Sequence, residues 1–259
     1  MKISLAGWSL HRKFYDKENP LKLIDFAEFA KTKFAIEAIE LNNIFFESTE
    51  KEYLEELNVE AKLSGVVMLN IAVDNHGNLI SENPDERIEA IERVRPWFSI
   101  AKSLGMTAIR ANTGGGVNPP EQEIQWAIES FSKLAQIGEQ NGIKILIENH
   151  GGLSANPDNI VAVIEGVGSE WIGTLPDFGN FADDIRYIGL EKIAPYAHSV
   201  HAKMYDFNNE GEETKIDINR CITILRNSGY DGFLGIEYEG EGDEIVGIKK
   251  AVALLKKYI

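Results

Sequence analysis

Four short apolar runs in this chain each end in a side chain that can bind a metal ion or move a proton. Residues 144–147 lead directly into Glu148, and later runs lead into Asp177, His201 and Glu237. A charged side chain at the end of an apolar run costs free energy unless it is paired or binds a cation. Four such runs in succession indicate one shared functional site, and we call its four residues the acid–histidine cluster.

The composition of the acid–histidine cluster favours a divalent metal. Three carboxylates that converge without a cation would repel one another in a partly desolvated site. Three oxygen ligands and one imidazole suit Mn²⁺, Mg²⁺ or Co²⁺, whereas structural zinc sites favour cysteine and histidine. We therefore predict a divalent metal cofactor, with manganese, magnesium or cobalt first and zinc left open.

The rest of the chain alternates short strand-like runs with longer segments of helical period, as parallel α/β folds do. Eight strand–helix units fill residues 1–259 without a linker or a shift of composition. They predict a single-domain (β/α)8 TIM barrel rather than an open doubly wound sheet. The predicted strands are 3–8, 35–41, 65–73, 107–112 and the four runs of the acid–histidine cluster. The predicted helices start near Pro20 and then cover 49–63, 84–104, 120–141, 157–166, 184–194, 218–228 and 243–258.

Several predicted helix boundaries carry local signals. Thr49 and Glu52 have the spacing of a capping box, and Asn83 is a candidate N-cap for the helix that follows it. Pro96 is expected to kink or divide that helix. Gly142 marks the end of the helix over 120–141.

In barrels of this kind the active site lies at the carboxyl ends of the strands. The acid–histidine cluster comes from strands five to eight, so its members are expected to be adjacent in space. Residues two apart in a strand share a face, which puts His150 beside Glu148 and Lys203 beside His201. We expect His150 to bind a substrate hydroxyl. Lys203 could offset negative charge on a reaction intermediate or pair with a ligand carboxylate.

Other residues at predicted strand ends are candidates for substrate contact. Glu40 could orient substrate or a histidine behind the metal, with an interior salt bridge as the alternative. Trp8 could form a pocket wall, and packing in the core or at the rim explains it equally well. His76 is interpreted as a turn residue and 113–116 as a flexible loop. The polar residues expected to contact substrate hydroxyls are Asn70, Arg110 and Asn112.

The composition excludes several classes of partner. A net charge of −15 disfavours a nucleic acid or an anionic membrane surface, because both attract a positive footprint. The amino-terminal residues show no signal-peptide pattern, and no apolar run approaches the roughly 20 residues that span a bilayer, so we predict a cytoplasmic protein. The one cysteine, Cys221, is expected to be a buried, inert thiol.

The segments 147–150, 176–180, 200–203 and 235–237 together resemble the sugar-phosphate isomerase/epimerase superfamily, the xylose-isomerase-like TIM barrels. The resemblance covers essentially the whole chain and is specific to the superfamily, not to one reaction. It implies that the acid–histidine cluster binds the metal and that Glu148 and Glu237 move a proton on either face of the substrate. Members often carry His-x-Lys-Asp, but Met204 follows Lys203 here, which leaves the role of Lys203 open.

The predicted function is a metal-dependent isomerase or epimerase of a small sugar or polyol-type carbonyl compound, acting through a metal-stabilised enediolate. A lyase is the first alternative, either an inosose-type dehydratase or an enzyme that eliminates a β-leaving group from a 3-keto sugar, because it shares that intermediate. A non-catalytic sugar-binding barrel is the second. DNA repair is disfavoured by the acidic charge and the 5 histidines. The sequence is compatible with a homo-oligomer and favours a non-phosphorylated substrate.

Overall fold

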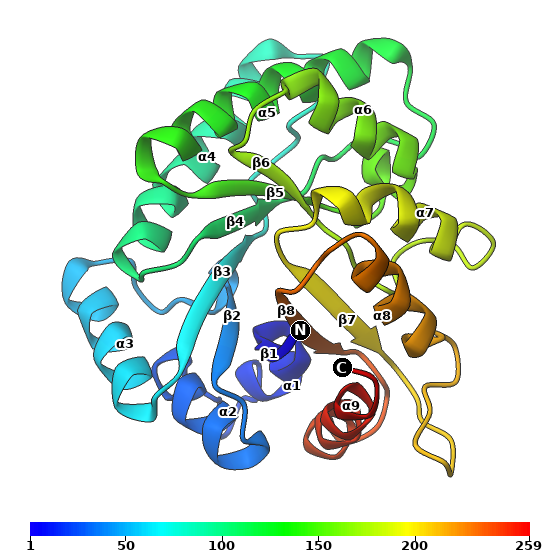
Figure 1. The fold of residues 1–259 in the computed structure, drawn as a ribbon. Helices are drawn as coiled ribbons and strands as arrows, with labels where there is room; N and C mark the ends of the chain where they lie inside the picture. Colours follow the sequence, from blue (N-terminus) through cyan, green and yellow to red (C-terminus); the bar gives the residue numbers. More distant parts are fainter.

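The computed structural model describes residues 1–259 and has one sheet of eight parallel strands at its centre (Figure 1). The strand order is β6-β5-β4-β3-β2-β1-β8-β7, so β1 pairs with β8 and every two consecutive strands except β6 and β7 are neighbours in the sheet. This order confirms the predicted (β/α)8 barrel. The strands are β1 (Lys2–Ala6), β2 (Ala38–Asn42), β3 (Val67–Val73), β4 (Ala108–Ala111), β5 (Lys144–Glu148), β6 (Ile172–Leu175), β7 (Val200–Met204) and β8 (Phe233–Tyr238).

The sheet closes between β6 and β7 through two parallel bridges instead of a continuous ladder. Thr174 pairs with Ala197, and Asp177 pairs with His201. The His201 N–H donates to the carbonyl of Pro176 at 3.0 Å. We had predicted Asp177 at the end of the sixth strand. It lies two residues beyond the end of β6 instead. The second bridge holds two members of the acid–histidine cluster side by side through the backbone.

Helices surround the barrel, and each strand is followed by one main helix (Figure 1). None of them combines the length and apolar character that crossing a bilayer requires. A short α1 (His11–Phe14) precedes the first main helix. The main helices are α2 (Phe26–Phe34), α3 (Lys51–Ser64), α4 (Pro84–Ser103), α5 (Glu121–Asn141), α6 (Pro157–Val167), α7 (Arg186–Ile193), α8 (Ile218–Asn227) and α9 (Glu244–Tyr258).

The helix boundaries test the local signals in the sequence. The Asn83 side chain accepts a hydrogen bond from the Asp85 N–H, which confirms it as the N-cap of α4. Pro96 lies inside α4 without dividing it. The predicted capping box at Thr49 is wrong, because the N-cap of α3 is Glu50 and its side chain makes no capping bond.

The strands have different surroundings on their two faces. Their outer faces pack against the helices in a core of 65 buried residues, which includes Cys221. Burial raises the pKa of the Cys221 thiol, as expected for an inert cysteine. A separate cluster of Ala108, Leu146 and Leu175 is buried on the inner face, in line with Glu148. Polar side chains share this interior, so the barrel can support a charged site.

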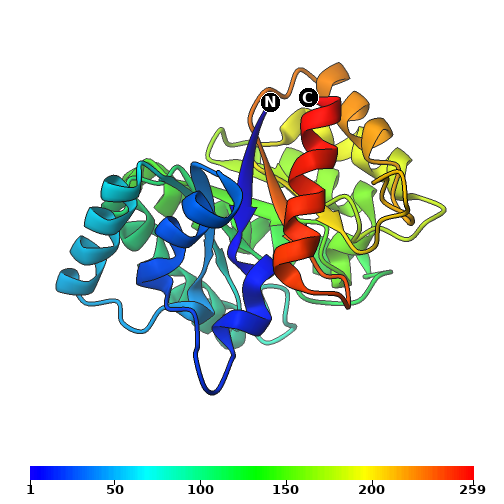
Figure 2. The same ribbon diagram turned by 90° about the horizontal axis from the view of Figure 1, so that it is seen from below.

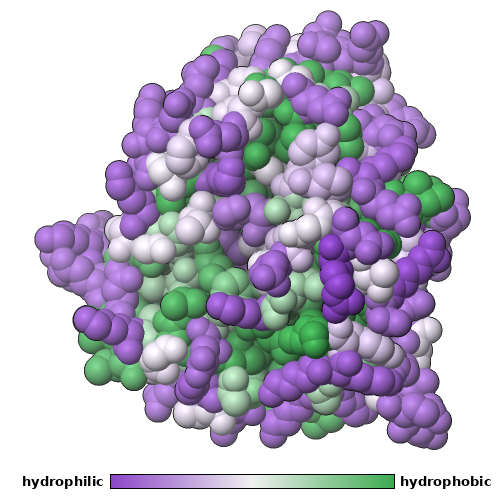
Figure 3. Space-filling view, viewed as in Figure 1, coloured by the Kyte–Doolittle hydropathy of each residue, from purple (hydrophilic) through white to green (hydrophobic).

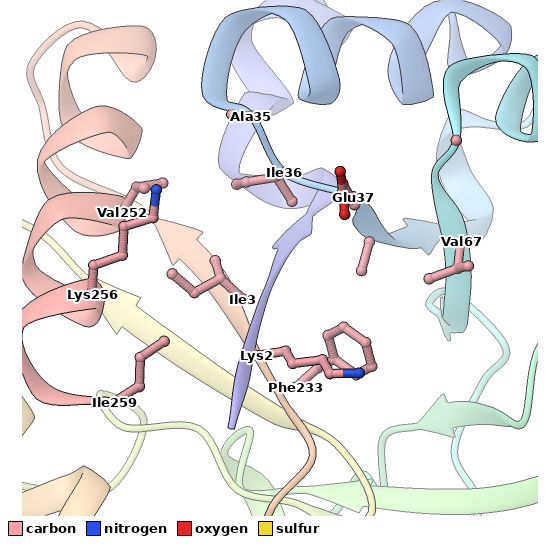
Figure 4. Close-up of a pocket in the computed structure, with 12 residues that line it drawn as sticks. Lys2, Ile3, Ala35, Ile36, Glu37, Val67, Phe233, Val252, Lys256 and Ile259 are labelled. Carbon is pink, nitrogen blue, oxygen red and sulfur yellow. The ribbon is translucent and has the colours of Figure 1, made fainter.

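The amino-terminal ends of the strands form the opposite face of the barrel. An apolar pocket of about 450 Å³ lies there, with Ile3, Val67 and Phe233 among its lining residues (Figure 4). The two chain termini lie close together at this end (Figure 2). Apolar residues also gather between α2, α3 and α9 on a face whose rim is hydrophilic (Figure 3). No member of the acid–histidine cluster lines this pocket, and we assign the amino-terminal face to stability.

Candidate metal centre

The acid–histidine cluster gathers at the carboxyl ends of β5 to β8. Glu148 is the last residue of β5, Asp177 follows β6, His201 is in β7 and Glu237 is near the end of β8. One potential ligand atom of each residue lies within 4.8 Å of the others. All four side chains are buried, and the least buried of them, Glu237, is only 5% exposed. The carboxyl ends of four strands thus bring four potential ligand groups to one point.

The hydrogen bonds of the cluster leave carboxylate oxygens free for a cation. Asp177 Oδ1 accepts from the backbone N–H groups of Gly179 and Asn180, each at 2.8 Å, but its buried Oδ2 has no hydrogen-bond partner. The Oε2 atoms of Glu148 and Glu237 are also buried and lie outside hydrogen-bond geometry. Buried polar atoms are nearly always satisfied in folded proteins, so Asp177 Oδ2 is the clearest open position. The Oε2 atoms of Glu148 and Glu237 each lie beside a buried cation. Together with one imidazole, these three oxygens form a donor set that fits a divalent metal.

The pKa shifts in the cluster reflect this crowding. Burial and the neighbouring carboxylates of Glu237 and Glu148 raise the pKa of Asp177 well above its usual range. Burial opposes ionisation of Glu148, but Arg110 and His201 outweigh it and hold the Glu148 pKa below its usual range. Burial would lower the pKa of His201, but Glu237 and Glu148 raise it well above its usual value. A bound metal would displace protons from the aspartate and the imidazole.

Two buried cations, Arg110 and Lys203, flank the cluster. Arg110 Nε lies 3.1 Å from Glu148 Oε2, and its Nη1 donates to Asp74 Oδ1 at 2.7 Å. Lys203 Nζ lies 2.9 Å from Glu237 Oε2. The two contacts to the cluster are close ion pairs that balance the negative charge of the two carboxylates. Of the two roles considered for Lys203, the geometry favours pairing with a ligand carboxylate.

A carboxylate behind His201 fixes the orientation of its ring. His201 Nδ1 lies 3.2 Å from Glu148 Oε1, whereas Nε2 lies 3.2 Å from Glu40 Oε2. Glu40 also accepts from Ser4 Oγ at 2.6 Å and from Asn70 Nδ2 at 2.8 Å. Such a partner selects the tautomer and increases the basicity of a metal-binding histidine. The Nδ1 atom is therefore the ring nitrogen that faces the other members of the cluster.

Glu40 and Asn70 lie below the cluster and not in the mouth of the barrel. They are 2% and 1% exposed, and neither lines the pocket above the cluster. The substrate contacts that we had predicted for both residues therefore find no support in the pocket lining and stay predictions. Of the roles considered for Glu40, orienting the histidine agrees with the structure.

A glycine in β8 leaves the space that Glu40 occupies. A Cβ atom on Gly235 would lie 2.2 Å from Glu40 Oε1. We expect Gly235→Ala to displace the carboxylate and to lower Mn²⁺ affinity about 10–100-fold, as loss of a supporting partner does in metal sites. Calorimetric titration with Mn²⁺ checks this. Glu40→Gln, which keeps the volume, should shift affinity in the same direction, and unchanged affinity in both variants would contradict the assignment.

A pocket of about 430 Å³ opens above the cluster. Of the residues predicted to contact substrate, Trp8, Arg110, Asn112 and His150 line it, and Glu237 is the cluster member in its wall. His150 lies beyond β5 and is exposed. The remaining lining residues are Tyr15, Asn42, Ile44, Asp74, Asn75 and Glu239. The pocket thus brings together aromatic and polar groups over the candidate metal site.

Sequence reasoning missed three polar residues of the site. Asp74 follows β3 and pairs with Arg110. Asn180 belongs to a quoted motif, but no role was assigned to it, and its Oδ1 accepts from Lys203 Nζ at 2.9 Å. Glu239 stands two residues beyond the last cluster member, so the alternation applied to the other strands would have found it.

Two loop predictions need correction. His76 is not simply a turn residue, because it is 4% exposed and its Nε2 accepts from the Asn112 N–H at 3.1 Å. Burial lowers the His76 pKa to about 4, so the ring is neutral at pH 7 and able to accept. In the loop 113–116, the Gly114 carbonyl accepts from the Leu153 N–H at 2.9 Å, which ties the loop to the segment after β5.

The model of the xylose isomerase-like TIM barrel family matches residues 24–258. The chain therefore belongs to this family, and the protein is an enzyme of the xylose isomerase-like class. The alpha subunit of C-glycoside deglycosidase from Arthrobacter globiformis is 37% identical over 65 residues, which is 25% of this chain. The matched segment spans only 18% of that relative's length.

Several solved structures share the fold across nearly the whole chain. A D-tagatose 3-epimerase-like protein aligns with a TM-score of 0.78 at 18% identity, covering 100% of this chain and 97% of its own. The IolI protein, solved with a zinc atom, aligns with a TM-score of 0.80 at 15% identity over 100% and 99%. The probable 3-DHS dehydratase AsbF of Bacillus anthracis aligns with a TM-score of 0.74 at 17% identity over 98% and 99%.

Proposed function

We propose that this protein is a divalent-metal-dependent isomerase or epimerase of a small, neutral sugar or polyol-type carbonyl compound. The observation that carries the proposal is the convergence of four buried ligand groups, within 4.8 Å of one another, beneath a pocket at the carboxyl ends of the strands. The name of the D-tagatose 3-epimerase-like neighbour supports the same class of reaction.

The residues of this chain divide the chemistry between them. A divalent cation held by the cluster would stabilise the negative charge that develops on the oxygens of a carbonyl substrate. Glu148 and Glu237 would accept and return the proton of the adjacent carbon, since both carboxylates are held in their ionised form. Lys203 and Arg110 would keep these two carboxylates in place. Trp8 and His150 would orient the substrate from the pocket wall.

The charges around the pocket favour a neutral substrate. Arg110 is the only lysine or arginine in the pocket lining, and it is paired with Asp74 and Glu148. We expect phosphorylated ketoses to be processed at least about tenfold less efficiently than their neutral counterparts, because the pocket's carboxylates repel a phosphate. Rates for D-fructose and fructose 6-phosphate, measured side by side, check this. A preference for the phosphate ester would contradict it.

A lyase is the second candidate, and the names of two similar proteins favour it. One is a C-glycoside deglycosidase alpha subunit and the other a probable dehydratase. Proton removal by the same carboxylate, followed by departure of a β-hydroxyl or another β-leaving group, would give elimination in place of isomerisation. The same acid–histidine cluster could therefore support either isomerisation or elimination.

One screen distinguishes these functions. The protein, supplied with Mn²⁺, is incubated in D₂O with ketohexoses and with a 3-keto glucoside, and products are followed by NMR. Deuterium at the exchanging carbon with a new isomer supports the first function, whereas loss of water or aglycone supports the second. Saturable sugar binding without deuterium incorporation would identify a non-catalytic sugar-binding barrel. Manganese as the resident ion, a cytoplasmic location and a homo-oligomeric state stay predictions.

A further inference from the structure

Glu239 continues the alternation of β8 one step beyond the acid–histidine cluster. Its N–H donates to the carbonyl of Met204, the last residue of β7, at 3.0 Å, which extends the pairing of the two strands one residue past the end of β8. The backbone of Glu239 is therefore fixed by the sheet. Its side chain is 28% exposed and lines the pocket above the cluster.

The Glu239 carboxylate joins an aromatic wall to the buried charges. Its Oε1 accepts from Trp8 Nε1 at 2.8 Å and lies 3.4 Å from Lys203 Nζ. Lys203 Nζ also lies 2.9 Å from Glu237 Oε2. The Trp8 ring stacks on His11 with the ring centroids 4.8 Å apart and the planes 17° from parallel. The edge of the indole is thus held by a charged acceptor while its face is held by stacking.

The hydrogen bond between Trp8 and Glu239 orients the indole ring in addition to packing it. An indole has a single polar atom, and a hydrogen bond from it to a carboxylate is stronger than one between neutral groups. This bond sets the angle at which Trp8 faces the pocket. Glu239 Oε2 accepts no hydrogen bond from the protein and remains available to a donor in the pocket. Hydroxyl groups of a polyhydroxy ligand are such donors.

We propose that Glu239 is a positioning and specificity residue of this site. It fixes the Trp8 ring as a pocket wall, and its Oε2 accepts a hydrogen bond from a hydroxyl of a neutral polyhydroxy ligand bound above the cluster. The second half rests on the proposed function for the class of ligand. The first half rests only on the contacts that join Trp8, Glu239 and Lys203.

The first half is tested by the indole N–H resonance of Trp8 in the ¹⁵N NMR spectrum of the metal-free protein, assigned by its loss in Trp8→Phe. It should move upfield in Glu239→Ala, because a hydrogen bond to a carboxylate is lost. Glu239→Gln keeps an acceptor oxygen and should restore most of the shift. Glu241→Ala is the matched control, since this exposed glutamate is in the same loop, and it should leave the resonance in place.

The second half is tested by titrating the Mn²⁺-loaded protein with D-fructose, D-tagatose and D-allulose in turn. Glu239→Ala should weaken binding of the ketohexose that binds best by about tenfold or more, the loss expected for a hydrogen bond to a charged group. Its Mn²⁺ affinity should stay close to that of the wild type and of Glu241→Ala. A purely structural role would leave sugar affinity unchanged.

The outcomes separate this inference from the proposed function. An unmoved indole resonance in Glu239→Ala, or wild-type sugar affinity in that variant, overturns the corresponding half. If the wild type binds none of the three sugars while the resonance moves as expected, the ligand half falls together with the proposed sugar class, and the positioning of Trp8 is upheld.

Discussion

Replacing Glu237 by glutamine is expected to slow turnover by about 10²–10⁴-fold, the contribution of a positioned acid–base group. Glu237 belongs to the cluster and also lines the pocket, so its carboxylate reaches both the metal position and a bound ligand. Burial opposes its ionisation, but Lys203 and His201 outweigh burial and hold the Glu237 pKa below its usual range. The carboxylate is therefore ionised at neutral pH and can act as a base, whereas an amide cannot.

Deuterium incorporation from D₂O into a ketose substrate measures this loss directly. The assay is run at saturating Mn²⁺, with metal content determined in parallel, so that loss of the base is separated from loss of a ligand. Glu241→Gln changes an exposed carboxylate in the neighbouring loop and should retain the wild-type rate. A Glu237→Gln protein that exchanges deuterium at the wild-type rate would remove Glu237 from the reaction.

Asp177→Asn is expected to raise the stability of the metal-free protein and to abolish most of its stabilisation by metal. Asparagine keeps the acceptor that Gly179 and Asn180 use, but it removes a buried negative charge beside Glu148 and Glu237. Because burial and those carboxylates raise the pKa of Asp177, the metal-free fold above the ordinary carboxyl pKa must either take up a proton at this site or hold a buried charge, and both cost stability. That cost fades as the pH falls from the raised pKa towards the ordinary value, and the advantage of the variant fades with it.

Thermal unfolding with and without Mn²⁺ tests both effects. At a free Mn²⁺ concentration of 100 times Kd, the wild type should gain about 2.7 kcal/mol, while the variant should gain little. Asp184→Asn is the matched control, because Asp184 is exposed in the same loop and should leave the gain intact. A full metal-induced shift in Asp177→Asn would exclude Asp177 from the ligand set.

Local patterns predicted most of the fold. Apolar strands alternating with helical periods allow few arrangements, and eight such units predict a closed barrel. Short-range signals such as Asn83 before α4 and Gly142 after α5 act within one turn of the chain, so they could be interpreted without tertiary information. The acid–histidine cluster was predictable for the same reason, because its members mark the carboxyl ends of successive strands.

Contacts across the barrel could not be predicted in this way. The alternation of side chains along a strand predicts which face of the sheet a residue is on, but not how deep in the barrel it lies. Asn70 was therefore expected at the mouth of the barrel, although it is buried below the cluster. The role of Glu40 depends on Gly235 and His201, which are distant in sequence and meet it only when the sheet closes. Trp8 follows β1 and Glu239 follows β8, so the link between them depends on the pairing of two strands that are far apart in sequence.

The most direct test of the central claim is the anomalous scattering of Mn²⁺ in crystals of this protein. We expect one strong peak at the carboxyl ends of β5 to β8, with Glu148, Asp177, His201 and Glu237 each contributing an atom at about 2.0–2.3 Å. A crystal grown with excess Mn²⁺ that shows no peak between these four side chains, or a peak bound elsewhere, would contradict the metal site and the chemistry derived from it.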